Sequence, residues 1–251
     1  MTFSIIIPSY NQDKYIEQTL QNVISLKKEA AQQGITIEIL LFDSDSKKEV
    51  QTIIHQYKTD IDVLEIAKDK GQYDAINKGL NKVKGDYWTW LNTDDLLIKN
   101  NFFKLVEILK SKPEIDYIFG GIDYIDAESK FIKTYAANNL YLENLYSKNP
   151  GIYQPGSFFK TNFTKEIGLL QPYKCCFDYE YILRCLSKNA NFYCCNFSLA
   201  AFRFHNESKT GSIIPIFIAE QLEISKKYGR KFYHFLTWFS YLRLLKHKII
   251  R

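Results

Sequence analysis

The sequence predicts an α/β fold in which a mainly parallel sheet is flanked by helices. Two observations support this prediction: short apolar runs alternate with amphipathic stretches of helix length, and a polar loop follows each apolar run. The composition agrees, because a chain of 251 residues that is 46% hydrophobic and 16% aromatic can bury a full core. We expect one main domain, because no linker interrupts the pattern.

The first two units have the order strand, polar loop, helix. Residues 3–8 form an apolar run that predicts a buried strand, and residues 15–26 predict the helix after it. Residues 35–42 predict a second strand, and residues 49–57 predict its helix, with Ser46 as a candidate N-cap. The repeated order is typical of crossover connections between parallel strands.

The same order continues further along the chain. A third strand is expected at residues 62–66, a helix at residues 73–83 and a fourth strand that ends at Leu91. Right-handed crossovers bring the carboxyl ends of such strands to one edge of the sheet. Ligands bind outside these carboxyl ends, so the polar loops after the strands predict a ligand site at this edge.

Two carboxylates, Asp94 and Asp95, follow the fourth strand directly. A carboxylate pair suits Mg²⁺ or Mn²⁺, because these ions keep several waters and take further ligands from the phosphates of a substrate. The alternative interpretation makes Asp95 the N-cap of a helix over residues 96–109. The segment by itself leaves both interpretations open.

Several strings in this order resemble a known family. They are SIIIPSYN (4–11), EILLFDSDS (38–46), DKGQYDAINKGLNKVKGDY (69–87) and LNTDD (91–95), followed by FDYE (177–180) and FRFHNES (202–208). Together they resemble the family 2 glycosyltransferases, nucleotide-sugar enzymes of the Rossmann-like GT-A fold. The resemblance covers about residues 1–210.

We therefore expect a GT-A glycosyltransferase domain over residues 1–212. Its nucleotide-binding half is expected at residues 1–95 and its acceptor-side half at residues 96–212. In the second half, residues 115–121 predict a strand and residues 153–159 lead into the acceptor region. A basic, aromatic helical tail is expected to follow over 213–251.

The resemblance implies that the nucleotide base is held by the loop after the first strand and by the acid after the second. In this sequence these positions are Pro8, Tyr10 and Asn11, together with Asp43. An aromatic ring and a carboxylate that accepts hydrogen bonds suit a uracil base. The alternative is that Tyr10 only packs and Asp43 only caps a helix.

Gly71, Asp74 and Asn77 lie where the third helix is expected to begin. Asp74 and Asn77 are three residues apart and share one helical face, so we expect both to point toward the same ligand. A helix start offers free backbone amides, and glycine permits close approach. The resemblance implies that this segment lines the nucleotide-sugar cleft, whereas a plain helix start with an exposed Asn77 is the alternative.

The family usually has Asp-X-Asp at the metal site, whereas this sequence has Asn92, Thr93 and Asp94. We expect Asp94 to be the principal ligand of Mn²⁺ or Mg²⁺, and Asn92 and Thr93 to contact the nucleotide. Asp95 is expected to be a further ligand, a supporting residue or a helix cap. His205 is a candidate ligand for the metal or a phosphate.

An acceptor hydroxyl that attacks the anomeric carbon of a sugar must lose its proton, and a nearby carboxylate can take it. Asp178 is the candidate base, because it lies near an expected helix start and its position resembles the base aspartate of inverting family members. Glu180 is a rival base. The alternative is that Asp178 is only an acid favoured at a helix N-terminus.

Five cysteines include two adjacent pairs but no CxxC spacing, so we expect free thiols rather than zinc ligands or disulfides. The odd count, and a start at Met1 without a secretory signal, predict a reducing cytosol.

The expected tail alternates aromatic and aliphatic stretches with lysine and arginine. Its longest uncharged piece, residues 232–242, is far shorter than the ~20 residues that a membrane span requires. A basic aromatic helix is suited to lie on an anionic membrane surface close to a lipid-linked acceptor. The alternative is that residues 216–228 pack onto the domain. The formal charge of +5 does not indicate nucleic acid, because no binding motif accompanies it.

We interpret the chain as an inverting glycosyltransferase. It is expected to move a sugar from a nucleotide diphosphate donor, a UDP-sugar, to a hydroxyl of a polysaccharide or lipid-linked glycan, in the cytoplasm or on the cytoplasmic face of the membrane. Inversion is implied by the resemblance alone. Two alternatives are a catalytically silent nucleotide-sugar-binding subunit, which Asn92 favours, and a sugar nucleotidyltransferase, for which the first turn lacks a Gly-rich basic loop.

Overall fold

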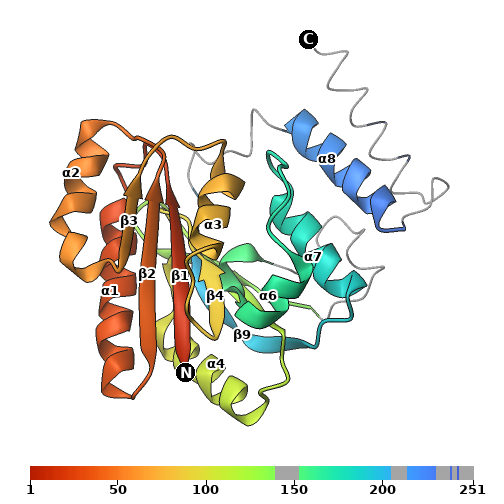
Figure 1. Cartoon of the computed structure of the whole chain (residues 1–251), viewed down its shortest axis with the longest axis horizontal. Helices are drawn as coiled ribbons and strands as arrows, with labels where there is room; N and C mark the ends of the chain where they lie inside the picture. The colour runs from red at the N-terminus through yellow and green to blue at the C-terminus, as the bar shows by residue number, and fades with distance from the viewer. Residues whose placement is uncertain (139–152, 205–213, 230–237, 239–241, 243–251) are drawn as a thin grey trace.

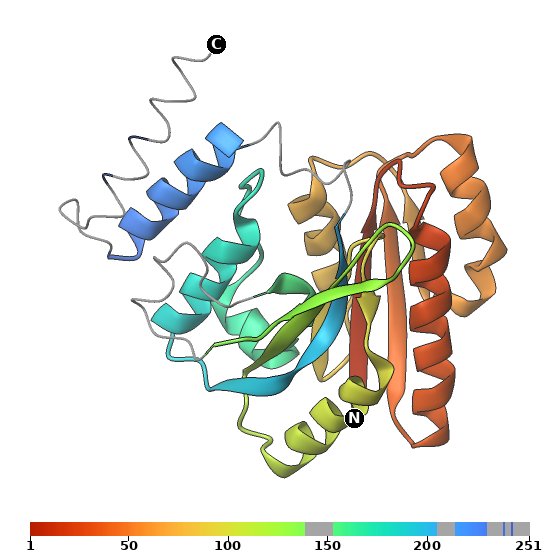
Figure 2. The same cartoon turned by 180° about the vertical axis from the view of Figure 1, so that it is seen from behind.

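The computed structural model describes residues 1–138, 153–204, 214–229, 238 and 242. Within these residues the centre of the molecule is a nine-stranded sheet with helices on both faces (Figure 1, Figure 2). The strand order is β3-β2-β1-β4-β8-β6-β9-β5, and β7 pairs with β6 beside this path. The predicted α/β fold is confirmed.

The N-terminal half is the parallel part of the sheet. Its strands are β1 (Thr2–Ser9), β2 (Thr36–Asp43), β3 (Val63–Ile66) and β4 (Tyr87–Trp90), and they are joined by helices α1 (Ile16–Gln32), α2 (Lys48–Gln56) and α3 (Gln72–Leu80), with the short turn η1 (Lys58–Asp60) before β3. β1 pairs in parallel with both β2 and β4, and β2 with β3. The order of elements agrees with the sequence prediction.

β1 forms where it does because it is a run of β-branched residues that is covered on both faces. Ile5, Ile6 and Ile7 are all fully buried. Ile5 and Ile7 belong to the core cluster under α1, α2 and α4, whereas Ile6 belongs to the cluster under α3, α6 and α7. Alternation along the strand therefore supplies two separate cores, one on each face of the sheet.

The C-terminal half is mixed in direction. Its elements are β5 (Leu96–Leu97), α4 (Lys99–Ser111), β6 (Tyr117–Ile125), β7 (Phe131–Tyr135), η2 (Gln154–Gly156), β8 (Ser157–Lys160), α6 (Thr161–Ile167), α7 (Phe177–Ser187), β9 (Phe192–Arg203) and α8 (Ile214–Lys227). β8 runs antiparallel to β4 and β6, while β9 runs parallel to β6. The sheet is thus parallel through β4 and turns mixed where β8 joins it.

Two predicted helix caps are wrong. The helix expected over residues 96–109 begins only at Lys99, because Leu96 and Leu97 pair with β9 as the short strand β5. Asp95 is therefore not an N-cap. Ser46 is not the cap of α2 either, because its hydroxyl donates to the Asp43 carboxylate at 2.6 Å.

Aromatic ring contacts fix α7 against the sheet. The ring centroids of Tyr181 on α7 and Phe159 on β8 are 5.1 Å apart, and those of Tyr181 and Trp88 on β4 are 5.8 Å apart. Each such contact contributes about 1 kcal/mol beyond the area it buries. At the carboxyl end of β4, the rings of Trp90 and Phe177 are 6.2 Å apart. This contact brings the first turn of α7 to the end of β4.

The first part of the expected tail packs onto the domain. α8 lies beside α7 (Figure 1), and its residues Ile218, Leu222 and Ile224 are buried. Ile224 belongs to the same core cluster as the rings that hold α7. In the part of the chain that the structure describes, no helix combines the length and the apolar character needed to cross a membrane.

Candidate active site

The loops after β1, β2 and β4 meet at one edge of the sheet. Ser9 and Asp43 end β1 and β2 and lie opposite each other in register. β4 ends at Trp90, directly before the segment that contains Asp94. The polar loops that the sequence predicts at one edge of the sheet are therefore brought together there.

Asp43 ties the first two loops together. It is 1% exposed, and its Oδ2 accepts hydrogen bonds from the hydroxyls of Ser9 (2.7 Å) and Ser46 (2.6 Å). Its Oδ1 accepts from the backbone amide of Ser46 at 2.8 Å. Asp43 thus fixes the shape of the loop before α2, and its proposed contact with a nucleotide base stays a prediction.

Asn11 joins the loop after β1 to the loop before α2. It has φ of 50°, its backbone amide donates to Ser46 Oγ at 2.8 Å, and its side-chain Oδ1 accepts from the backbone amide of Lys47 at 2.9 Å. Next to it, Tyr10 is 68% exposed, so its ring does not pack in the interior. Pro8 lies buried within β1. This loop therefore presents an aromatic ring on a fixed backbone.

The start of α3 is a glycine-dependent turn. Gly71 has φ of 119°, a conformation that favours glycine, and its amide donates to Asp69 Oδ1 at 2.8 Å. Asp74 Oδ2 accepts from the amide of Lys70 at 3.1 Å. Gln72 Nε2 donates to Asn92 Oδ1 at 2.6 Å. The helix start is thereby joined to the loop after β4.

Asn77 and Asp74 bond to different partners in the structure, and their contact with one common ligand stays a prediction. The carboxamide of Asn77 donates to the carbonyl of Leu170 and accepts from its amide, each at 2.9 Å. Asn77 therefore joins α3 to the loop that precedes α7. It acts as a structural link between the two halves of the chain.

The loop after β4 is a tight turn built on Asp95. Asp95 is fully buried, its Oδ2 accepts from Asn92 Nδ2 at 3.1 Å, and its Oδ1 accepts from the backbone amide of Arg203 at 3.2 Å. Burial and the neighbouring charge of Asp94 raise the pKa of Asp95 well above its usual range. Thr93 is buried, whereas Asp94 and Asn92 are half-buried. Asp95 supports the loop, which makes Asp94 the better candidate for a metal ligand.

Arg203 is a site residue that sequence reasoning missed. It is 1% exposed, and its Nε donates to the carbonyl of Asp94 at 3.0 Å. Its other nitrogens donate to Gln18 Oε1 (2.7 Å) and to the carbonyl of Asp126 (3.0 Å). The guanidinium carbon also lies 4.5 Å from the ring centroid of Tyr15. The sequence feature that could have indicated Arg203 is its position as an arginine at the end of the apolar run of β9.

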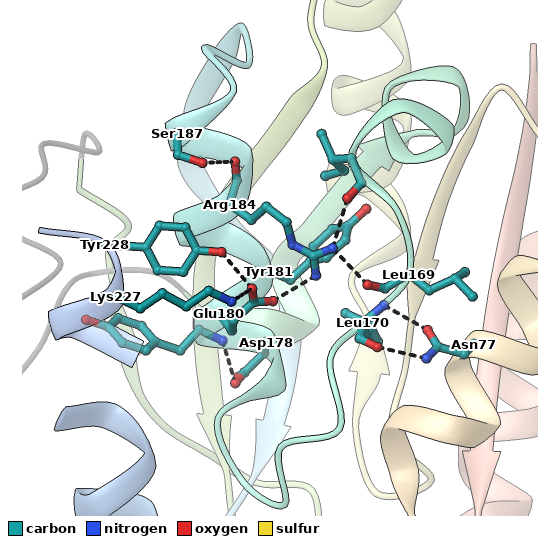
Figure 3. A network of polar contacts seen from close by, with 12 residues as sticks. Asn77, Leu169, Leu170, Asp178, Glu180, Tyr181, Arg184, Ser187, Lys227 and Tyr228 are labelled. Atoms are coloured by element: carbon teal, nitrogen blue, oxygen red, sulfur yellow. Dashed lines mark hydrogen bonds and ion pairs between the residues drawn. The ribbon is translucent and has the colours of Figure 1, made fainter. Parts of the chain in front are cut away.

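The two rival bases on α7 have different surroundings (Figure 3). Glu180 is fully buried; its Oε2 accepts from Arg184 at 2.7 Å and its Oε1 from the hydroxyl of Tyr228 at 2.6 Å. Asp178 is half-buried, and its Oδ1 accepts from the amide of Tyr179 at 2.7 Å. Burial raises the pKa of Asp178 to about 6. Glu180 is thus committed to structure, and Asp178 is the better candidate base.

Comparison with known proteins identifies the family of the chain. The sequence model of "Glycosyl transferase family 2" matches residues 4–177, which is more than half of the chain. The chain belongs to glycosyl transferase family 2.

Relatives with curated names match only part of their own length. An uncharacterized glycosyltransferase of Rickettsia prowazekii is 32% identical over 127 residues, which are 50% of this chain and 38% of that protein. The poly-beta-1,6-N-acetyl-D-glucosamine synthase of Staphylococcus aureus is 24% identical over 119 residues, which are 47% of this chain and 27% of the synthase. The chain therefore spans less than half the length of these relatives.

Solved structures show the same fold. TarS of S. aureus in complex with UDP has a TM-score of 0.65 and 16% identity, covering 91% of this chain and 65% of that chain. The mannosyltransferase PcManGT from Pyrobaculum calidifontis in complex with GDP-Man and Mn²⁺ has a TM-score of 0.68 and 14% identity, covering 96% and 70%. The predicted GT-A fold is confirmed.

The donor set of this family 2 chain suits a cation that arrives with its substrate. Among the described residues no group of three or more His, Cys, Asp and Glu side chains is placed to hold a metal ion. Asp94 supplies one carboxylate, and Mg²⁺ and Mn²⁺ commonly take their remaining ligands from phosphates and water. The candidate ligand His205 lies outside the described residues.

All five cysteines lie in described residues and are free, as the sequence predicts. Cys176, Cys185 and Cys195 are buried, and burial raises the pKa of each of these thiols. Because the thiolate is the reactive form, these residues are inert packing groups at neutral pH.

The network around Arg203 leads to a stability prediction. Arg203→Met keeps most of the side-chain volume but leaves carbonyls of two loops without donors, so we expect the free energy of unfolding to fall by about 3 kcal/mol. Urea denaturation measures this change. The exposed Lys48→Met is the matched control and is expected to stay within about 0.5 kcal/mol of wild type. Equal stability of both variants would contradict the assigned role.

Proposed function

We propose that the chain is an inverting glycosyltransferase that moves a sugar from a UDP-sugar donor to a hydroxyl of a polysaccharide or lipid-linked glycan. One observation carries the proposal. The half-buried Asp94 is held at the carboxyl end of β4 by Arg203, and the Trp90–Phe177 contact brings the start of α7, with Asp178, to the same strand end. Family membership and the fold support it.

The donor is assigned to the loops of the parallel half. The exposed ring of Tyr10 offers a stacking surface to the uracil base beside the loop that Asp43 and Asn11 fix. TarS was solved with UDP and with UDP-GlcNAc, which supports a uridine donor. Gly71 permits close approach of the nucleotide-sugar to the start of α3.

Asp94 is proposed to hold Mn²⁺ or Mg²⁺ together with the two phosphates. A cation bound there would stabilise the negative charge of the departing nucleoside diphosphate. PcManGT was solved with Mn²⁺ and a sugar nucleotide, which supports the assignment. Asp95 and Arg203 fix the backbone that carries Asp94 from the buried side of the loop.

Asp178 is proposed to act as the general base. The acceptor hydroxyl oxygen forms a bond to the anomeric carbon while the bond from that carbon to the phosphate oxygen breaks. The hydroxyl proton passes to the carboxylate of Asp178, and the nucleoside diphosphate leaves with the bonding electron pair. Attack from the face opposite the leaving group inverts the anomeric centre.

One second candidate has support from a contact. Asn92 stands where the family usually has an acid. Its carboxamide accepts a hydrogen bond from Gln72 and donates one to Asp95, so it stabilises the loop after β4. A catalytically silent nucleotide-sugar-binding subunit would tolerate this replacement. No observation favours a sugar nucleotidyltransferase. Donor binding without turnover of any sugar nucleotide would favour the silent subunit.

Removing the Asp94 carboxylate tests the metal assignment. Asp94→Asn is expected to weaken UDP binding in the presence of Mn²⁺ by at least about tenfold, because the cation loses its protein ligand. Isothermal titration calorimetry with and without Mn²⁺ measures the change. The exposed Asp45→Asn, in the loop before α2, is the control. A UDP affinity that Mn²⁺ raises equally in wild type and Asp94→Asn would refute the assignment.

Removing the Asp178 carboxylate tests the base. Asp178→Asn is expected to lower kcat by about 10³-fold with UDP affinity unchanged, because only proton transfer is lost. In wild type, kcat/KM is expected to rise with pH through about 6, since the ionised form is the base.

The same raised pKa gives a stability readout. Because the folded-state pKa of Asp178 lies above its ordinary value, the carboxyl stabilises the fold less as pH rises through about 6. Asp178→Asn is therefore expected to melt at or above the wild-type temperature at pH 8.

Full catalytic activity of Asp178→Asn would contradict the assignment of Asp178 as the base.

We also propose peripheral contact with the inner face of an anionic membrane, near a lipid-linked acceptor. α8 exposes Ile216 and Phe217, at 38% and 46%, and its last turn ends in Lys226 and Lys227. Further along the tail Trp238 is 60% exposed. Aromatic rings beside lysines are typical of helices that bind anionic surfaces.

Liposome sedimentation tests this contact. The variant Phe217→Ala with Trp238→Ala is expected to bind vesicles containing phosphatidylglycerol about tenfold more weakly than wild type, because two inserting rings are lost. Phe131→Ala, an exposed ring on β7, is the control. Equal binding of all three proteins, or no binding of wild type, would dispose of the membrane contact.

A further inference from the structure

α8 is hydrogen-bonded to the segment that leads into α7. The carboxylate of Glu220 accepts hydrogen bonds from three consecutive backbone amides: Oε1 from Lys174 at 2.7 Å, and Oε2 from Cys175 at 2.8 Å and Cys176 at 3.0 Å. The carbonyl of Phe217, one turn earlier on α8, accepts a weaker hydrogen bond from the thiol of Cys176 at 3.5 Å. One side chain of α8 thus fixes three peptide units in a row.

The three amides belong to the segment that leads into α7, which begins at Phe177. α7 has Cys176 as its N-cap residue, and no side chain of the N-cap position bonds to the first turn. Amides at a helix start lack intrahelical acceptors, and a negative charge is favoured there. Glu220, 44 residues away from Cys176 in sequence, places a carboxylate at this helix start by binding the three amides directly before the first turn.

A second contact joins α8 to the first turn of α7. The hydroxyl of Tyr228, just after α8, donates to Glu180 Oε1 at 2.6 Å, and Lys227 lies 3.5 Å from the same oxygen (Figure 3). Asp178 lies in sequence between Cys176 and Glu180, and so between the two contacts with α8. Contacts with α8 and with the residue that follows it therefore flank Asp178 on both sides in sequence.

We propose that Glu220 is a positioning residue that sets the place of the Asp178 carboxylate, so that α8 is part of the active-site architecture. The inference rests on the proposed function, in which Asp178 is the base. A displacement of about 1 Å at a reacting group costs on the order of 100-fold in rate. Because Glu220 fixes the backbone two residues before Asp178, releasing it moves the base and leaves the donor loops of the parallel half unchanged.

The charge of Glu220 acts on the pKa of Asp178, so its removal is expected to shift the acid limb of the kcat/KM profile. A purely structural role of Glu220 would leave that limb unchanged. The titratable groups that act on or are affected by Asp178 are Glu220 on α8, Tyr117 on β6 and Cys176 before α7. Burial and the neighbouring carboxylate of Glu220 both raise the pKa of Asp178. Removing this charge lowers the pH at which Asp178 ionises.

The experiment uses the full chain with three variants, which are Glu220→Ala, Glu220→Gln and the control Glu223→Gln. Glu223 lies on the same helix, and its carboxylate accepts from the hydroxyl of Tyr173 rather than from a backbone amide. The measured quantities are kcat, the UDP affinity in Mn²⁺, the acid limb of the kcat/KM profile and the melting temperature. Asp178→Asn is measured in parallel.

Glu220→Ala is expected to lower kcat by about 100-fold while UDP affinity stays within about threefold of wild type. Glu220→Gln keeps an acceptor oxygen but loses the charge. Its kcat is therefore expected to lie between that of Glu220→Ala and that of wild type, and the acid limb of its kcat/KM profile is expected to move to lower pH. Glu223→Gln is expected to leave kcat and the acid limb at wild-type values.

Two results would overturn the inference. The first is a wild-type kcat in Glu220→Ala. The second is a kcat and an acid limb in Glu220→Gln that match wild type; this variant decides the question if Glu220→Ala fails to fold. A fully active Asp178→Asn would instead refute the base itself, so failure of the proposed function is distinguishable from failure of this inference.

Discussion

The guanidinium of Arg203 is the constraint on which the rest of the site depends. It is buried, and it donates to three segments that are distant in sequence, namely the loop after β4 at Asp94, the turn after β6 at Asp126, and α1 at Gln18. A buried cation must keep its donors satisfied, so these segments cannot separate without leaving a charged donor unpaired. With Asp95, whose carboxylate accepts from the Arg203 amide, it fixes the backbone that presents Asp94.

The two halves of the site come together through contacts that cross the chain. Asn77 bonds to Leu170 through both sides of its carboxamide, and the rings of Trp90 and Phe177 meet at the carboxyl end of β4. These contacts seat α7 beside the parallel half of the sheet, and Glu220 then fixes the segment that enters α7. The helix that carries the candidate base is thus positioned by residues on α3, β4 and α8.

Sequence patterns were sufficient for the parallel half of the fold and for the position of its loops. Apolar runs and helix periods are local properties, so β1, β2 and their helices follow from composition. The patterns failed where a partner lies far along the chain. Asp95 looks like a helix cap until β9 pairs with the residues after it, and Asn77 looks exposed until Leu170 meets it. Arg203 and Glu220 were missed for the same reason, since their roles are defined only by contacts with distant backbone.

The measurement that tests the central claim most directly is anomalous diffraction from a crystal grown with UDP and Mn²⁺. The account predicts a manganese peak at about 2.1 Å from an oxygen of Asp94, with oxygens of both phosphates in the same coordination sphere. It also predicts that Arg203 still holds the carbonyl of Asp94. Ordered UDP without a manganese peak beside Asp94, or UDP bound away from the carboxyl ends of β1, β2 and β4, would contradict it.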